Sequence, residues 1–182
     1  MKKSKEIQKL VLASSLVAIS IVIDIFFKQV LNFNNFGVPF YAIPIVFGSI
    51  ILGPIYGLVM GYASDLVGFI AFPNGVYAFI FALSAMIWGF VPGLFLYKKF
   101  DKVKLVFTML GAHILATIGN TIGLLTILPT ETALASLTIR LTMIPINVII
   151  ITVLVTHLYQ KLLPVLVDMD LKSAKELSNP QM

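Results

Sequence analysis

Two isolated basic residues, Lys28 and Arg140, are the first candidates for chemistry in this chain. All the other Lys and Arg residues fall in three basic clusters, which are Lys2, Lys3, Lys5 and Lys9; Lys98, Lys99, Lys102 and Lys104; and Lys161, Lys172 and Lys175. Loops rich in Lys and Arg stay on the cytoplasmic side of a membrane, so the clusters predict one shared aqueous side. Lys28 and Arg140 lie near the ends of apolar runs that reach the opposite side. Their placement predicts an anion-binding site at the outer mouth of a helical bundle.

The composition excludes a soluble domain. The mean hydropathy is +1.00, and 59% of the residues are hydrophobic while 12% are charged, against about 25% charged in soluble proteins. A membrane-spanning helix needs about 20 apolar residues, so 182 residues predict about six spans with short loops. The net charge of +5 follows from the cytoplasmic loops, which argues against nucleic-acid binding. Without Cys, disulfides and thiolate chemistry are excluded.

We predict an all-α integral membrane protein with six transmembrane helices in one bundle and both termini cytoplasmic. The chain, residues 1–182, is expected to form one transmembrane domain, with spans at about 9–31, 38–52, 54–72, 76–97, 105–128 and 137–160 and a cytoplasmic tail at 161–182. The first apolar run is too long for a signal peptide and is interpreted as a retained span.

The break at Gly53-Pro54 divides the long apolar stretch 38–72 into two spans. With that division, the cluster that begins at Lys98 lies on the cytoplasmic side. The second span is short and could be re-entrant or broken by its prolines. The outer loops are expected at 32–37, 72–75 and 129–136, and the first and third are long enough to cover a cavity.

Arg140 and Asn147 lie seven residues apart on one helix face. An Arg at the centre of a membrane helix costs about 2.5–3.5 kcal/mol and indicates a functional site. The alternative is that Arg140 extends into the lipid headgroups. Lys28 lies four residues after Asp24, so it either contacts an anionic ligand or pairs with Asp24.

Asp65 ends a stripe with Gly53, Gly57 and Gly61 at four-residue spacing. Small residues at this spacing let membrane helices approach closely, so Asp65 is expected to face protein or a cavity. It could accept hydrogen bonds from a nitrogen-rich ring, or it could pair with Arg140 or Lys28.

Phe36, Tyr41 and Tyr77 belong to an aromatic group at the outer end, where an interfacial belt is the alternative to ligand contact. Trp88 lies too deep for a belt and could stack on a ligand ring or pack in the core. Asn120 is a further candidate ligand contact.

His113 shares a face with Asn120 and is expected to be a structural polar group. Ser14 and Ala18, four residues apart on the first span, could pack inside the bundle or dock a partner membrane protein.

The sequence contains no phosphate-binding loop G-x-x-x-x-G-K-[ST], no H-E-x-x-H, no G-x-S-x-G and no cluster of metal ligands. We therefore expect no enzymatic activity, no cofactor and no metal site.

A set of residues resembles the substrate-binding S components of energy-coupling factor vitamin transporters, most closely the folate-specific branch. The set is Pro44, Gly53-Pro54, Gly57, Gly61, Asp65-Leu66, Gly68, Pro73, Gly75, Tyr77, Arg140 and Pro145. The resemblance covers essentially the whole chain, and 44–77 is its most specific part. It implies a multi-pass bacterial plasma-membrane protein that captures a vitamin outside and topples in the membrane to release it inside.

The resemblance also implies partners: a transmembrane coupling protein and two cytoplasmic ATPases. Ser14 and Ala18 match the motif that contacts the coupling protein, with Ser in place of the more usual Ala. The residue types favour folate apart from the resemblance. Asp65 and the aromatic side chains fit a pterin ring, and Lys28 and Arg140 fit an anionic glutamate tail. The alternatives are an S component for pantothenate or riboflavin and an autonomous ion-coupled transporter.

Overall fold

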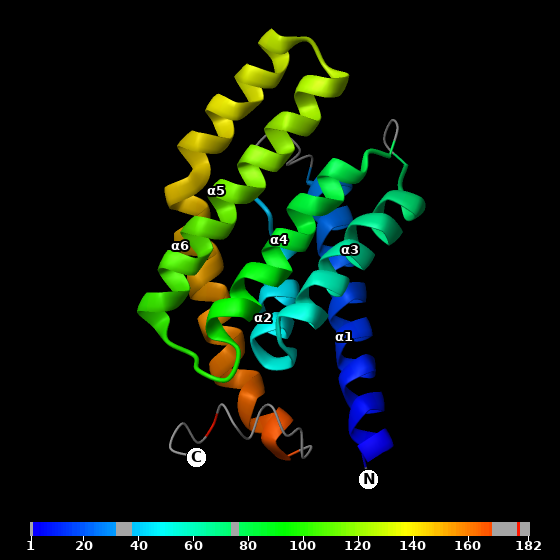
Figure 1. Ribbon diagram of the computed structural model, residues 1–182, viewed down its shortest axis with the longest axis vertical. Coiled ribbons are helices and arrows are strands. Elements are labelled where there is room, and N and C mark those ends of the chain that lie inside the picture. The colour runs from blue at the N-terminus through cyan, green and yellow to red at the C-terminus, as the bar shows by residue number, and fades with distance from the viewer. Residues whose placement is uncertain (1, 32–37, 74–76, 169–177, 179–182) are drawn as a thin grey trace.

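The computed structural model describes residues 2–31, 38–73, 77–168 and 178. Within them the chain forms α-helices, one π-helix and no strand. These elements are α1 (Lys2–Ile25), η1 (Phe26–Val30), α2 (Ala42–Leu52), α3 (Pro54–Ala71), α4 (Phe79–Leu96), α5 (Lys102–Ile127) and α6 (Thr130–Asp168). The all-α prediction is confirmed (Figure 1). Five helical stretches, all except α2, are long and apolar enough to cross a membrane.

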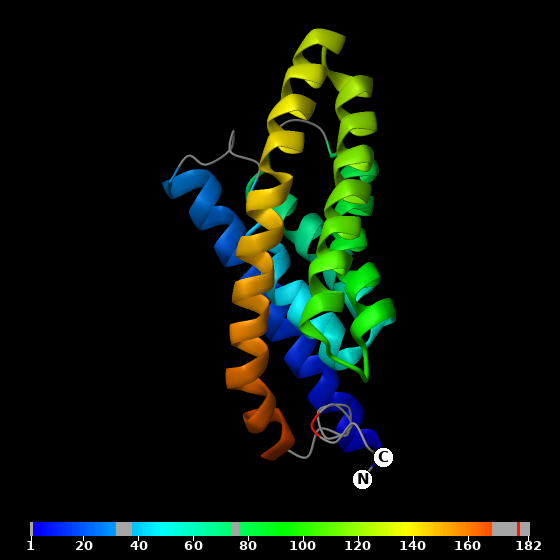
Figure 2. The same cartoon turned by 90° about the vertical axis from the view of Figure 1, so that its left-hand side faces the viewer.

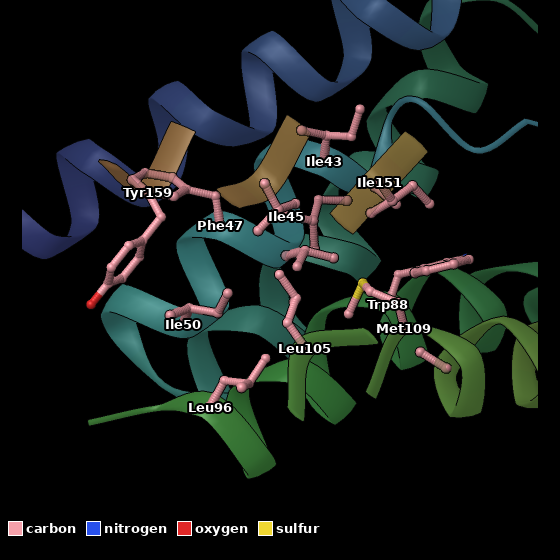
Figure 3. Close-up of a cluster of buried hydrophobic side chains, with 14 of the residues drawn as sticks. Ile43, Ile45, Phe47, Ile50, Trp88, Leu96, Leu105, Met109, Ile151 and Tyr159 are labelled. Carbon is pink, nitrogen blue, oxygen red and sulfur yellow. The ribbon is translucent and has the colours of Figure 1, made fainter. Parts of the chain in front are cut away.

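The short helix α2 forms the centre of the bundle. Each of its residues, Ala42 to Leu52, is buried, and a helix that is apolar on every side belongs in a protein interior. Figure 3 shows Ile45 and Phe47 of α2 packed with side chains from other helices, Met109 and Ile151 among them. Eleven residues span about 16 Å, about half of a bilayer's hydrocarbon core. The helix α2 therefore serves as a core helix around which the longer ones pack.

The predicted helix break at Gly53-Pro54 separates α2 from α3. Gly53 has a φ of 101°, a left-handed conformation that glycine adopts without steric cost. Pro54 occupies the first position of α3, where its missing N–H removes no helical hydrogen bond. The two helices therefore join through a sharp turn.

The helices α3 and α4 pack backbone to backbone, as the glycine stripe predicts. A Cβ added at Gly57 would overlap the carbonyl of Gly89, and one at Gly61 would overlap the carbonyl of Ala85. No side chain fits between the helices at these points. This contact sets the height of Asp65 on α3 relative to α4.

The last helix is longer at both ends than the sequence indicated. The expected outer loop 129–136 is wrong, because α6 begins at Thr130 and continues to Asp168. Good helix formers such as Ala133 and Leu134 extend the helix at its start, and the N–H of Ala133 bonds the carbonyl of Pro129. Beyond residue 160, Leu166 remains buried against the core, which keeps this part of the expected tail helical.

The start of α1 and the end of α6 lie at the same end of the bundle (Figures 1 and 2). The opposite end, which we call the distal end, holds the end of η1, the end of α3 and the start of α4. The antiparallel pair α5 and α6 extends furthest in that direction (Figure 2).

Candidate functional site

A cavity of about 490 Å³ opens in the distal half of the bundle. This volume lies in the range of small-molecule sites. Its walls come from α1 with η1, the segment 38–41, α3, α4, α5 and α6. Most of the predicted substrate-binding residues line it, namely Lys28, Tyr41, Asp65, Tyr77, Trp88, Asn120 and Arg140. Residues that are far apart in the sequence thus meet around one space.

Two predicted residues are not among those lining the cavity. Asn147 is fully buried in the helix interface, where its Nδ2 lies 2.8 Å from Nε2 of His113. Its predicted direct ligand contact is therefore not supported, because another protein side chain stands between it and the space. Phe36 lies outside the described residues.

Arg140 contributes a half-buried positive charge to the cavity wall. Among the described residues, its Nη1 nitrogen is buried and has no hydrogen-bond partner. Because α6 starts at Thr130, Arg140 lies about 15 Å along this helix. It therefore sits in the bundle rather than at a helix end. A guanidinium with one buried, unused donor is suited to bind a ligand carboxylate.

Lys28 lies at the rim of the cavity and contacts Asp24. Its Nζ is 2.7 Å from Asp24 Oδ2, and the Lys28 side chain is 53% exposed. This is the intrahelical pair that the spacing allowed. Exposed pairs of this kind contribute at most about 1 kcal/mol, so the pair leaves Lys28 able to contact an anion that enters the rim. The π-helix η1 carries Lys28, and such segments often mark functional positions.

Asp65 lines the cavity, as do Lys28, Arg140 and Tyr77. Within the described part of the chain, Asp65 forms no ion pair with Lys28 or Arg140, so the predicted pairing alternatives are not realised. Tyr77, before α4, lies near Asp65, and burial together with this carboxylate raises the pKa of Tyr77 to about 12. The Tyr77 phenol therefore stays protonated and can donate a hydrogen bond.

Aromatic pairs form part of the distal wall. Phe27 of η1 stacks on Phe40 at 4.0 Å between ring centroids, and Phe69 of α3 contacts Tyr77 at 5.1 Å. All four rings line the cavity. They provide apolar faces against which a flat ring can pack.

The floor of the cavity combines Trp88 with a polar group. Trp88 is 2% exposed, and its ring meets His113 edge to face at 5.3 Å. Trp88 thus belongs both to the core and to the cavity wall. His113 bonds Asn147 and Thr117, which agrees with the structural role expected for it.

Several residues that line the cavity were not predicted from the sequence, among them Phe27, Phe40 and Thr117. Phe27 and Phe40 adjoin Lys28 and Tyr41 in the sequence, so each could have been found as a neighbour of a predicted residue. Thr117 carried no recognisable signal, because threonine is common in membrane helices.

Ser14 and Ala18 lie on the exposed face of α1. Their alternative role in packing inside the bundle is therefore not realised among the described residues. Small exposed side chains at this spacing leave a shallow surface on which another helix can pack closely.

A bundle of apolar helices around a small-molecule cavity, with a cation and a carboxylate in its walls, defines a membrane protein that binds a solute. Comparison with known proteins identifies the class of membrane protein. Residues 8–167 match the family described as "ECF transporter, substrate-specific component", and the chain belongs to this family. It is an integral membrane protein and a transporter component, not an enzyme.

One curated relative is the folate transporter FolT of Clostridium novyi (strain NT), which is 31% identical over 97 residues. The match covers 52% of this chain and 56% of the relative, so the chain spans about half the length of that curated protein. No solved structure matches.

Proposed function

We propose that this chain is the folate-binding subunit of an ATP-driven vitamin importer. The observation that carries the proposal is a cavity lined both by Arg140, whose buried Nη1 has no hydrogen-bond partner among the described residues, and by the carboxylate of Asp65. Folate needs both, because it has an anionic glutamate and a pterin with N–H donors. The resemblance to FolT of Clostridium novyi supports the same ligand.

The proposed ligand lies along the depth of the cavity. The glutamate carboxylates contact Arg140 and, at the rim, Lys28. The pterin lies deeper, where Asp65 accepts its N–H groups and Trp88 packs beside its ring. Tyr41, Tyr77 and Asn120 supply further hydrogen bonds. Ser20 of α1 is level with Ser64 of α3. The backbone of Lys28, eight residues further on, therefore lies about 12 Å above the level of Asp65, and its Nζ reaches back to Asp24.

Partner subunits complete the proposed importer. They are a transmembrane coupling protein, which packs on the face of α1 around Ser14 and Ala18, and two cytoplasmic ATPases. Docking and ATP hydrolysis then topple this subunit and open the cavity inward. An autonomous ion-coupled carrier is the alternative, and uptake into vesicles with and without the ATPase module separates the two.

The proposed topology has six crossings with both termini in the cytoplasm, where α2 with the segment 38–41 forms a short second crossing. The shared end of α1 and α6 supports it. The chain has no Cys, so single cysteines can be introduced without background. A membrane-impermeant thiol reagent applied to intact cells should label Glu131→Cys and spare Lys99→Cys; the reverse pattern would refute this topology.

Folate binding can be read from Trp88, the one Trp of the chain. The purified protein in lipid nanodiscs is titrated with folate, pantothenate and riboflavin, and each ligand is then tested in competition with labelled folate. A saturable change in Trp88 fluorescence with folate, which excess pantothenate and riboflavin do not compete away, is expected. If folate gives no saturable response and one of the other vitamins does, the ligand assignment is wrong.

A further inference from the structure

A buried chain of hydrogen-bonding side chains runs from α6 through α5 to the cavity. Asn147 Nδ2 lies 2.8 Å from His113 Nε2, and His113 Nδ1 lies 3.2 Å from Thr117 Oγ1. These residues are 0%, 4% and 4% exposed. His113 and Thr117 line the cavity, whereas Asn147 stands behind them. This series of hydrogen bonds thus ends at the cavity floor.

The direction of these hydrogen bonds follows from which atoms can donate. An amide nitrogen can only donate, so Asn147 Nδ2 makes His113 Nε2 an acceptor. A neutral imidazole that accepts at Nε2 carries its proton on Nδ1 and donates there. Thr117 Oγ1 therefore accepts from His113. The hydroxyl hydrogen of Thr117 is left to donate to something else.

Thr117 differs from other threonines of the same helices in what it bonds. Thr108, Thr121, Thr138 and Thr142 each donate to the backbone carbonyl four residues earlier. Thr117 makes its bond to the His113 ring instead, and no acceptor for its hydroxyl hydrogen is found among the described residues. A buried donor needs an acceptor, and the cavity beside Thr117 is where one can enter.

The surroundings limit the chemistry of that acceptor. Trp88 and Ala116 line the floor with Thr117 and His113, so this floor carries an aromatic face and no charged side chain. Arg140 lies seven residues before Asn147 on α6, about 10 Å nearer the distal end. A carboxylate is held better at Arg140, so the floor suits an uncharged oxygen or ring nitrogen on a flat heterocycle.

We propose that Thr117 donates a hydrogen bond to the oxo group of the bound heterocycle, with Asn147 and His113 as positioning residues that set the direction of this bond. The inference rests on the proposed folate function, in which that group is the C4 oxo oxygen of the pterin. Ligands with a donor at this position are disfavoured, because they leave the buried hydroxyl hydrogen of Thr117 without an acceptor.

The test compares folate with aminopterin, which carries an amino group in place of the C4 oxo oxygen. Both affinities are measured by titration of Trp88 fluorescence for the wild type, Thr117→Val, Thr117→Ser and a matched control, Thr121→Val. Valine has nearly the shape of threonine but no hydroxyl. The change in the affinity ratio, rather than the ratio itself, isolates the contact, because other differences between the ligands cancel.

Thr117→Val should shift the folate-to-aminopterin affinity ratio by about tenfold toward aminopterin, which corresponds to about 1.4 kcal/mol. Thr117→Ser and Thr121→Val should leave the ratio within about twofold, since serine keeps the donor and Thr121 bonds its own helix. An unchanged ratio in Thr117→Val would overturn the inference while leaving folate binding intact. Failure of the wild type to bind folate would instead refute the proposed function.

A second measurement needs no ligand. The chain has two His residues, so ¹⁵N NMR of the protein labelled at histidine gives two ring systems, which His157→Gln assigns. The His113 ring should be the neutral tautomer protonated at Nδ1, and Asn147→Leu should abolish this preference. A ring protonated at Nε2 in the wild type would show that the hydrogen bonds run the other way and would overturn the inference.

Discussion

Gly57 of α3 and Gly89 of α4 face each other with no side chain between them, and each would place a Cβ against the other's carbonyl. This contact lets two helices approach more closely than larger residues allow. Asp65 lies eight residues beyond Gly57, about 12 Å along α3, while Trp88 immediately precedes Gly89. The glycine contact therefore holds the Asp65 wall and the Trp88 floor of the cavity at a set separation.

Replacing Gly89 with Ala should destabilise the protein because the new methyl group meets backbone, which cannot rotate away. Overpacking of this kind typically costs about 1–3 kcal/mol. The thermal unfolding midpoint in detergent should fall, and folate affinity should fall with it. Gly111→Ala is the matched control, because a Cβ there meets nothing within 4 Å, and its midpoint should stay the same or rise. Equal midpoints for the two variants would contradict the role given to this contact.

Arg140→Gln should weaken folate binding about 10- to 100-fold. A hydrogen bond to a charged group is worth about 1.5–3 kcal/mol, and glutamine keeps a donor but loses the charge. Lys161→Gln is the control, since Lys161 is exposed on the same helix far from the cavity. Isothermal titration calorimetry measures the folate affinity of both variants. Comparable affinities for the two variants would show that Arg140 does not hold the ligand.

Lys28→Gln should weaken binding less than Arg140→Gln, by about two- to fivefold, because Lys28 is exposed and already contacts Asp24. Its contribution should shrink as salt rises, since exposed charges are screened. Binding titrations at low and high salt distinguish the contribution of Lys28 to affinity from that of Arg140. An effect of Lys28→Gln that exceeds that of Arg140→Gln at every salt concentration would reverse this assignment.

The sequence predicted the membrane class, the break at Gly53-Pro54 and the close packing along the glycine stripe, because these depend on local composition and spacing. Most of the substrate-binding residues that it predicted line the cavity. Charged or polar side chains are costly inside an apolar bundle, so Asp65 and Arg140 stand out against their neighbours without knowledge of the fold.

Other features depend on long-range contacts that spacing does not encode. Asn147 shares a helix face with Arg140, but its distance from the cavity depends on the neighbouring helix, where His113 lies in front of it. The helical start of α6 was missed because polar residues near Thr130 are typical of loops and of first helical turns alike. The central position of α2 follows from burial on all sides, which its length alone does not determine.

Asp65→Asn should lower folate affinity about tenfold, because the amide replaces one acceptor oxygen with a donor group that opposes the pterin N–H groups. Competition with free pterin and with p-aminobenzoylglutamate, the two halves of folate, shows which half of the ligand has lost affinity. We expect the variant to lose competition by pterin and to retain competition by the glutamate half. Asp168→Asn is the control, at the far end of α6. An equal loss for both halves would indicate that Asp65 supports the fold rather than the ring.

Ala18→Trp should block uptake while leaving folate binding unchanged. Ala18 lies on the exposed face of α1 with Ser14, away from the cavity lining, and a large side chain there prevents the close approach of a partner helix. Binding is measured on the isolated subunit, and uptake is measured in vesicles that also contain the coupling protein and ATPases. Ile149→Trp is the control, because Ile149 is 64% exposed but lies on α6. Loss of uptake in both variants, or in neither, would mean that the partner does not select the α1 face.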